Sequence, residues 1–409
     1  MKNVLIIGGG ASGMIAAIIA SKNGNKVTIL EKNNICGKKL LLTGASHCNY
    51  WNDDFTINHF RSSNKDLLNE VINEENKKNI LNFFDSIGVI PKIKNGYYYP
   101  YSNVSNSILN SLLLEMNKNN VNIIYNANVK NLKYFNNKFI VNYNNDFLET
   151  DKVIIATGSF AAPKTGSDGY GFELLQKFNH TINNITPALV QLVADGNYFK
   201  LWSGIRAEAN IKLEEKNKII AEYNGELQLT DYGLSGICAM QLSGRISKGL
   251  FNKLDEYVLI DFMPSFNKDL NEFVSYCNLR ANKIPNRNLV EFFESIINYK
   301  LLMVLFKVNN ININTPWQKL NKEEKIKVIN TLRKFKLKII DTKSFNEAQT
   351  CTGGIPLEEI NISSFESLKQ KGLFITGELI DVDGDCGGYN LGFAWISGFL
   401  AGLGASKND

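Results

Sequence analysis

Histidine and paired cysteines are scarce in this sequence, and their scarcity excludes several classes of site. The 409 residues include only three histidines, His47, His59 and His180, which lie too far apart to suggest a metal site built from imidazoles. The six cysteines are scattered, with no Cys-x-x-Cys pair and no zinc-like spacing. A disulfide framework is not expected in so long a chain, so we expect a reducing, cytoplasmic location and no metal.

Blocks of one charge and candidate membrane spans are also missing. The 45 basic and 40 acidic side chains give a net charge of +5 that is spread along the chain. This mild balance gives little reason to expect a nucleic-acid partner, and none to expect a membrane. The uncharged run at residues 4–20 carries four glycines within residues 8–13, which favours a strand, a turn and a helix over a signal peptide.

The sequence has the composition of an ordinary globular protein and is long enough for more than one domain. Hydrophobic residues make up 44% and charged residues 21% of the chain, which is enough apolar material for a large core. The length indicates two or three domains.

The sharpest motif follows the first apolar run, Val4–Ile7, which predicts a strand buried on both faces. Residues 8–13 read Gly-Gly-Gly-Ala-Ser-Gly and satisfy G-x-G-x-x-G. A helix is predicted from Met14 to Asn23, and a second strand, Lys26–Leu30, ends at Glu31. This order of strand, glycine turn, helix, strand and acid is typical of a dinucleotide-binding fold.

Each part of this motif has a physical role. Gly8 permits the tight turn, Gly10 lets the backbone approach a pyrophosphate, and Gly13 lets the helix and strand pack closely. The helix N-terminus offers unpaired N–H groups to the phosphates. Glu31 can accept hydrogen bonds from ribose hydroxyls, which favours FAD or NAD over NADP.

A second motif near the C-terminus decides in favour of FAD. A strand is predicted over Gly372–Glu378, ending in Gly377-Glu378. An acidic turn at residues 381–385 and a helix of small residues, Gly392–Gly402, are expected to follow it. A nicotinamide enzyme has no need of such a returning element, whereas the flavin of an extended FAD molecule must be held outside the first fold. We expect the N-terminus of that last helix to face the flavin pyrimidine.

These residues resemble the bacterial FAD-binding oxidoreductases of the aminoacetone oxidase-like family, which includes the flavoprotein reductases of bile-acid dehydroxylation. The similarity runs nearly end to end, from the first glycine motif to the Gly377-Glu378 and Gly388–Leu391 signature. It implies that Glu378 contacts the ribityl chain, that Gly388–Leu391 lies beside the isoalloxazine and that Val129 contacts the adenine. Where the family usually has Gly-Arg, this chain has Ser46-His47, so a histidine replaces an arginine near the cofactor.

Motifs and resemblance together predict a set of site residues, although no catalytic residue can be assigned. The substrate-face candidates are His47, Tyr99 and Arg206, whereas His59 and His180 are expected at the surface. The predicted cofactor-binding residues are Gly8, Gly10, Ala11, Ser12, Gly13, Glu31, Lys32, Lys38, Thr43, Gly44, Cys48, Asn49, Val129, Ala156, Thr157, Gly158, Gly377, Glu378, Asp385, Gly388, Tyr389, Asn390 and Leu391.

The middle of the chain changes character twice, which predicts two insertions in an α/β, Rossmann-like FAD-binding domain. That domain is expected at residues 1–190 and 342–409. Residues 191–263 read as a β-rich substrate or cap domain, to which 336–345 could add a strand, and residues 264–335 as a helical insertion. We expect the insertions to cover the flavin face.

Local signals within these regions predict hairpins and one helix start. Asn136-Asn137 is expected to join strands at 132–135 and 138–143, and Asn224-Gly225 to join strands at 219–223 and 226–230. Residues Asn321 to Glu324 resemble a capping box.

The sequence therefore predicts an FAD-dependent oxidoreductase that exchanges hydride between flavin N5 and a small molecule. NAD(P)H could serve as an electron donor. We expect it to bind only transiently, because a single G-x-G-x-x-G is found and it is assigned to FAD. Two alternatives stay open: a flavin-dependent RNA-modifying enzyme, and a flavin-loaded scaffold without turnover. Neither the substrate nor the oligomeric state follows from the sequence.

Overall fold

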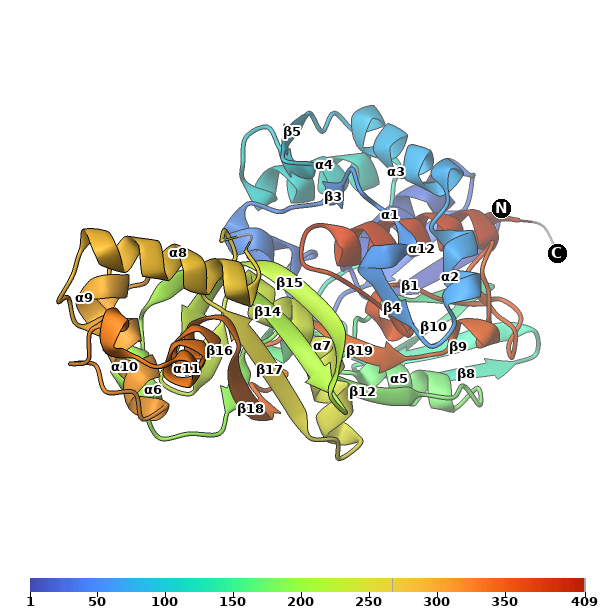
Figure 1. Cartoon of the computed structure of the whole chain (residues 1–409). Coiled ribbons are helices and arrows are strands. Elements are labelled where there is room, and N and C mark those ends of the chain that lie inside the picture. The colour runs from blue at the N-terminus through green and yellow to red at the C-terminus, as the bar shows by residue number, and fades with distance from the viewer. Residues whose placement is uncertain (267, 408–409) are drawn as a thin grey trace. The chain divides into compact units, whose positions relative to one another are not determined.

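The computed structural model describes residues 1–266 and 268–407 (Figure 1). The chain forms two compact units, one made of Met1–Thr186 with Ala348–Asp409 and the other of Pro187–Glu347. The first unit therefore combines the two ends of the sequence.

The first unit is built on a parallel sheet whose strands are apolar on both faces. The central strand β1 (Asn3–Ile7) pairs in parallel with β2 (Lys26–Leu30) and with β11 (Lys152–Ile155). The full sheet order is β20-β21-β22-β11-β1-β2-β7, with β20 (Ile360–Asn361), β21 (Glu366–Ser367), β22 (Leu373–Ile375) and β7 (Asn122–Ile124).

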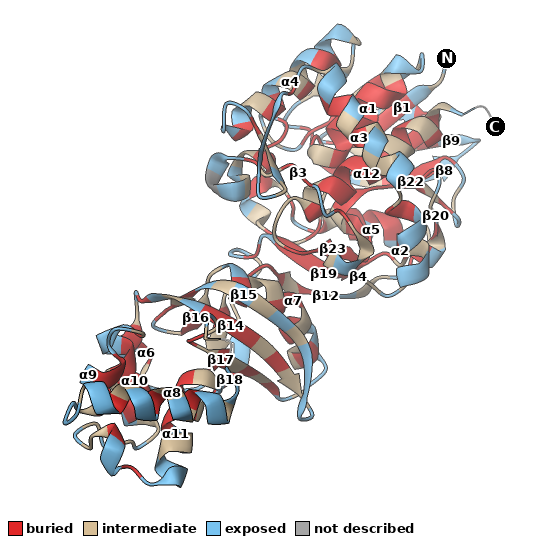
Figure 2. Ribbon diagram, turned by 45° about the horizontal axis from the view of Figure 1, so that its top comes forward, coloured by how far each residue is buried: buried red, intermediate tan, exposed pale blue. Residues whose placement is uncertain are grey.

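Buried helices pack against this sheet, and Figure 2 shows buried residues running along α1 and α12. The longer helices are α1 (Ala11–Lys22), α3 (Glu74–Ser86), α4 (Ser105–Lys118) and α12 (Tyr389–Ser406), with the shorter α2 (Lys65–Val71) and α5 (Tyr170–Gln176). This is a Rossmann-like α/β domain, as the sequence predicts.

Small sheets complete the first unit. The predicted hairpin across Asn136-Asn137 is confirmed, since both residues have left-handed φ angles, of 49° and 60°, between β8 and β9. These sheets contain β8 (Val129–Phe135), β9 (Lys138–Tyr143) and β10 (Asp146–Thr150); β3 (Trp51–Asn52), β5 (Pro91–Lys94) and β6 (Tyr97–Pro100); β4 (Phe60–Ser62) and β23 (Val382–Gly384); and β19 (Thr350–Gly354) with β12 (Asn183–Ala188).

The second unit contains a closed antiparallel barrel in the order β13-β16-β15-β14-β17-β18. Helices α8 to α11 follow β17 in the chain, and the capping box at Asn321 is confirmed at the start of α11. The elements are β13 (Leu192–Ala194), α6 (Phe199–Trp202), β14 (Arg206–Glu215), β15 (Lys218–Leu229), β16 (Gly233–Ser235), α7 (Ile237–Phe251), β17 (Glu256–Asp261), α8 (Leu270–Lys283), α9 (Leu289–Phe293), α10 (Tyr299–Val308), α11 (Lys322–Arg333) and β18 (Phe335–Thr342).

The hairpin predicted at Asn224-Gly225 is wrong. Both residues lie inside the continuous strand β15, where Asn224 pairs with Asn210 of β14 and accepts a hydrogen bond of 2.8 Å from its side chain. The turn between β14 and β15 lies instead at Lys216-Asn217, whose φ angles of 48° and 62° are left-handed. Pairing along the whole length of β14 overrides the local turn preference.

Candidate functional site

The glycine turn between β1 and α1 is shaped by close backbone contacts. Gly8 has a φ of +104°, and a methyl group there would lie 2.5 Å from the carbonyl oxygen of Ala156. A methyl group at Gly13 would lie 2.1 Å from the carbonyl oxygen of Gly8. At Gly10, in contrast, the nearest atom to such a methyl group is that same Ala156 oxygen, at 3.8 Å. The first and third motif glycines are therefore needed for packing, whereas the second leaves open space.

That open space lies at the start of α1. Gly10 is the N-cap of the helix, and no side chain caps the N–H groups that follow it at Ala11, Ser12 and Gly13. An uncapped helix N-terminus is a site for an anion such as a pyrophosphate. The residues present therefore fit the FAD pyrophosphate.

Glu31 is buried beside this turn, but its carboxylate is already bonded within the protein. Oε2 accepts from the backbone N–H of Gly9 at 2.7 Å, and Oε1 accepts from the backbone and side chain of Asn33 at 2.7 and 2.8 Å. A carboxylate has about four acceptor positions, so room for a ribose hydroxyl remains. Nearby, Ala127 donates to the backbone oxygen of Glu31, and Val129 is buried at the start of β8.

The C-terminal motif reaches the same region because α12 packs closely on α1. A methyl group at Gly398 would lie 2.3 Å from the backbone oxygen of Ser12, and one at Gly402 would lie 2.8 Å from that of Ala16. The Thr376 hydroxyl lies 3.0 Å from that of Ser12. The small residues of α12 thus bring the two distant motifs together (Figure 1).

Helix α12 also begins without a capping side chain. Its N-cap, Gly388, has a φ of +94°, and a methyl group there would meet the backbone of Trp51 at 2.7 Å. Asn390 uses its side chain to bond the backbone N–H and oxygen of Gly384, each at 2.8 Å. Tyr389 packs its ring against Phe55 and Phe60. The start of α12 could therefore offer uncapped backbone N–H groups to a flavin.

Charged residues around the predicted cofactor path are paired. Glu378, in the short helix η6 (Gly377–Leu379), forms a 2.6 Å ion pair with Lys39. The sequence analysis names Lys38 as a cofactor residue and misses Lys39. Lys32 pairs with Asp168, and Lys38 contacts the side-chain oxygen of Asn33 at 3.4 Å. After β11, Ala156 donates to Ile7, and Gly158 adopts a left-handed φ of +75°.

The loop after β2 carries the remaining predicted cofactor residues. Thr43 and Gly44 lie in η1 (Leu40–Ser46), and Cys48 follows, fully buried. Burial raises the pKa of the Cys48 thiol to about 11, so it stays protonated and acts by packing. The Asn49 amide, with its nitrogen as donor, reaches the backbone oxygens of Trp51 and Tyr98 at 2.8 and 3.1 Å.

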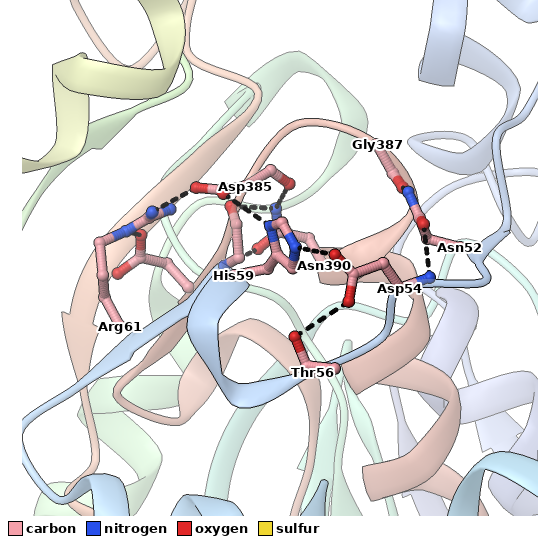
Figure 3. A network of polar contacts seen from close by, with 10 residues as sticks. Asn52, Asp54, Thr56, His59, Arg61, Asp385, Gly387 and Asn390 are labelled. Atoms are coloured by element: carbon pink, nitrogen blue, oxygen red, sulfur yellow. Dashed lines mark hydrogen bonds and ion pairs between the residues drawn. The ribbon is translucent and has the colours of Figure 1, made fainter. Parts of the chain in front are cut away.

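The predicted acidic turn at residues 381–385 is wrong, because β23 (Val382–Gly384) pairs there with β4. Asp383 lies opposite Arg61, whose Nε donates to it at 2.6 Å. The Nη1 atom of Arg61 donates to Asp385 at 2.5 Å (Figure 3). Burial raises the pKa of Asp383, and the charge of Arg61 opposes that effect. The sequence analysis misses Arg61, because only the pairing of β4 with the distant strand β23 brings Arg61 next to Asp383 and Asp385.

The three histidines have different surroundings. His47 is exposed, and its Nδ1 lies 2.8 Å from the backbone oxygen of Asn103. His59 is partly buried between Asp54 and Asp385. The surface placement expected for His180 is wrong, since it is 4% exposed, with Nδ1 at 2.7 Å from Glu359 and Nε2 at 2.7 Å from the Ser367 hydroxyl.

The other two substrate-face candidates lie in different units. Tyr99 is half-buried in β6 of the first unit, where burial raises the pKa of its hydroxyl. Arg206 begins β14 of the second unit, and its guanidinium forms an exposed 3.0 Å ion pair with Glu226. Leu391 lies in the first turn of α12 and is partly buried against the core of the first unit.

Comparison with known proteins gives matches along the whole chain. A family model described as HI0933-like protein Rossmann domain matches residues 2–404. The chain is 35% identical over 409 residues to the 3-dehydro-bile acid delta(4,6)-reductase of Clostridium scindens, with 100% of both chains covered. It is 24% identical over 400 residues to the ribosomal RNA dihydrouridine synthase of Escherichia coli, covering 97% of this chain and 96% of the relative.

Solved structures show the same fold at low identity. The 3-ketosteroid-delta4-(5alpha)-dehydrogenase of Rhodococcus jostii, in complex with 4-androstene-3,17-dione, aligns with a TM-score of 0.52 at 14% identity, over 100% of this chain and 97% of that one. The 3-ketosteroid delta1-dehydrogenase of Sterolibacterium denitrificans aligns with a TM-score of 0.52 at 10% identity, over 99% of this chain and 100% of that one. Within residues 1–266 and 268–407, no helix has the length and apolar character to cross a membrane.

Proposed function

The chain belongs to the HI0933-like Rossmann-domain family and is an FAD-dependent oxidoreductase, and we propose that it reduces a carbon–carbon double bond conjugated to a carbonyl group in a small apolar molecule. The observation that carries this proposal is the full-length similarity, at 35% identity, to a reductase of 3-dehydro-bile acids. The double bonds named in that activity are conjugated to a 3-oxo group.

FAD, when bound and reduced, would supply a hydride from N5 to one carbon of the double bond, and a proton would add to the other carbon. The chain's own residues would bind and orient the cofactor: the start of α1 at the pyrophosphate, Glu31 at the adenosine ribose, and the start of α12 beside the flavin. The paired charges of Lys39 and Glu378 would fix the ribityl chain. His47, Tyr99 and Arg206 remain proposed substrate contacts.

A second candidate substrate is a uracil base in RNA. It is favoured by the relative at 24% identity named as a ribosomal RNA dihydrouridine synthase, whose named product is uracil with its ring double bond saturated. That bond is also conjugated to a carbonyl group, so both candidates require the same hydride chemistry. They differ in the surface that must recognise the substrate.

One experiment separates the two candidates. The FAD-loaded protein is reduced anaerobically and mixed with a steroid 4-en-3-one, with uridine or with ribosomal RNA, while flavin reoxidation and product mass are followed. We expect reoxidation by the enone, with a product that has gained two hydrogen atoms. Reoxidation by RNA alone would establish the second candidate, and no reoxidation by any of the three would favour the scaffold without turnover.

A further inference from the structure

His59 is held between two carboxylates in the polar network of Figure 3. Its Nε2 lies 2.8 Å from Oδ2 of Asp54, and its Nδ1 lies 3.1 Å from Oδ2 of Asp385. An ionised carboxylate only accepts hydrogen bonds, whereas a neutral imidazole donates from just one of its nitrogens. The doubly protonated imidazolium is therefore the form of the ring that satisfies both contacts.

The surrounding charges favour the same form. Arg61 divides its single charge between the buried carboxylates of Asp383 and Asp385, so a charged His59 supplies a second cation. Burial lowers the pKa of His59, but its hydrogen bonds to Asp54 and Asp385 outweigh burial and raise the pKa above the ordinary value. On the outer side, Asp54 is exposed and its pKa is lowered by the His59 hydrogen bond, with Lys77 of α3 acting in the same direction.

His59 is tied to the segment from Asp385 to Tyr389 at both ends. Its backbone oxygen accepts from the N–H of Asp385 at 2.9 Å, next to the side-chain contact. Its ring stacks on that of Tyr389, with centroids 4.5 Å apart and planes inclined by 16°. Burial raises the pKa of the Tyr389 hydroxyl, so the stacked phenol is neutral and its face can attract a cation.

We propose that His59 is a positioning residue for FAD, whose charged imidazolium holds the segment from Asp385 to Tyr389 and thereby the start of α12. Loss of one proton would turn a nitrogen lone pair toward a carboxylate and weaken the stack on Tyr389. The start of α12 would loosen, and FAD would bind more weakly. This inference rests on placing the flavin beside residues 388–391 and does not depend on the substrate.

The test measures the dissociation constant of FAD between pH 6 and pH 9. We expect the wild-type constant to rise about tenfold as His59 loses its proton, which corresponds to a difference of one pKa unit between the free and bound protein. The variant H59Q should bind FAD weakly at every pH and lose this step. The variant D54N keeps the imidazole but removes its outer carboxylate, so the step should move to lower pH.

A matched control is D53N. Asp53 is exposed and adjacent, but its carboxylate accepts from the Tyr98 hydroxyl at 2.7 Å and makes no contact with His59. Its profile should follow the wild type. A wild-type profile in H59Q, or a step that D54N leaves in place, would overturn the proposal.

The charge state of His59 can also be read directly, because the chain contains only three histidines. In protein labelled with nitrogen-15 at histidine, the spectra of H47Q and H180Q identify the His59 signals by elimination. We expect both ring nitrogens to carry protons at pH 7 in the FAD-loaded protein, and a neutral ring would overturn the proposal even if H59Q failed to fold. A protein that shows the expected FAD profile but reduces no enone would refute the proposed function alone.

Discussion

Two histidines in the first unit contact acidic side chains, yet their surroundings favour different charge states. His59 lies between two carboxylates and is satisfied only as an imidazolium. His180 contacts Glu359 through Nδ1 and the Ser367 hydroxyl through Nε2. That hydroxyl oxygen already accepts from the N–H groups of residues 369 and 370, so its own proton points to His180. A neutral His180 with its proton on Nδ1 fits, and its pKa is lowered by burial.

Acid should therefore destabilise the first unit through His180. In the unfolded chain this histidine takes up a proton below about pH 6.5, whereas the folded protein resists it, so stability falls as pH drops from that value toward the lowered folded pKa. His59 makes the opposite contribution, which is fully present below pH 6.5 and is lost only as pH rises through its raised pKa. We expect the urea midpoint of the first unit to fall between pH 6.5 and pH 5.

Glu359 contributes to acid unfolding at a lower pH. Burial raises the pKa of Glu359, but its hydrogen bonds to Lys369 and other groups lower that pKa to about 2. Its contribution to the stability of the folded protein is therefore lost only below about pH 4.5. The variant H180Q separates the contributions of His180 and Glu359. It should remove the fall of the urea midpoint between pH 6.5 and pH 5 and keep the fall below about pH 4.5. An unchanged urea midpoint across the upper window would contradict a neutral His180.

The glycines of the first motif also differ as single residues. Gly13 is in direct contact with Gly8, whereas Gly10 has a φ of −78° that any residue can adopt and has no neighbouring atom closer than 3.8 Å to an added methyl group. The sequence motif alone does not distinguish packing from cofactor approach. The structure separates them by what surrounds each Cβ position.

We expect the variants G10A and G13A to fail in different ways. G10A should keep the melting temperature of the FAD-free protein and lose at least tenfold in FAD affinity, because its methyl group fills only the space that the pyrophosphate needs. G13A should unfold at lower temperature even without FAD, since its methyl group would overlap the Gly8 carbonyl. Thermal unfolding of the FAD-free proteins and FAD titration measure the two effects. Tight FAD binding by G10A would remove Gly10 from the proposed site.

At the scale of elements, signals carried by neighbouring residues are read correctly, and those that depend on distant pairing are not. The strand Lys26–Leu30 and the capping box at Asn321 need only local sequence. The same local reasoning fails at residues 381–385, where antiparallel pairing with β4 makes a strand of an apparent turn. It fails again at Asn224-Gly225, because ten residues of β14 are paired along β15. Arg61 and His59 were missed for this reason, since their partners lie more than three hundred residues away along the chain.

The displaced turn between β14 and β15 can be improved. Lys216 and Asn217 occupy the two left-handed positions of a two-residue hairpin loop, for which Asn-Gly is the preferred pair. The double variant K216N/N217G should raise the unfolding free energy of the second unit by about 1 kcal/mol, by relieving left-handed strain. Denaturant unfolding measures it. A lower stability would show that the Lys216 side chain has a role that its backbone geometry does not reveal.

At the scale of the whole molecule, the sequence predicts an FAD-binding domain made of residues 1–190 and 342–409, because its two motifs flank a long region of different character. The two ends of the chain form one unit, and the middle forms another. The closure of β13 to β18 into a barrel could not be predicted, because it is a property of pairing among strands and not of any one strand. Family membership confirms the resemblance and the cofactor, whereas the substrate contacts remain a proposal.

The architecture of the second unit bears on the source of electrons. Its described strands form an antiparallel barrel, and between residues 191 and 338 no G-x-G-x-x-G follows a strand and opens a helix. A dedicated nicotinamide site of the Rossmann type needs that arrangement, since the helix N-terminus binds the pyrophosphate. If NAD(P)H reduces this flavin, it would have to bind transiently where the substrate binds.

We therefore expect NADH and NADPH to reduce the bound flavin slowly and without saturating at micromolar concentration. A steroid 4-en-3-one should compete with them, because the two would share one place over the flavin. Anaerobic stopped-flow absorbance at a series of nicotinamide concentrations, with and without the steroid, measures both effects. The control is G10A reloaded at high FAD concentration, which should react with the nicotinamide at the wild-type rate once its flavin is bound. Rapid reduction that saturates at micromolar nicotinamide and ignores the steroid would require a second nucleotide site, built without the glycine motif that such sites ordinarily use.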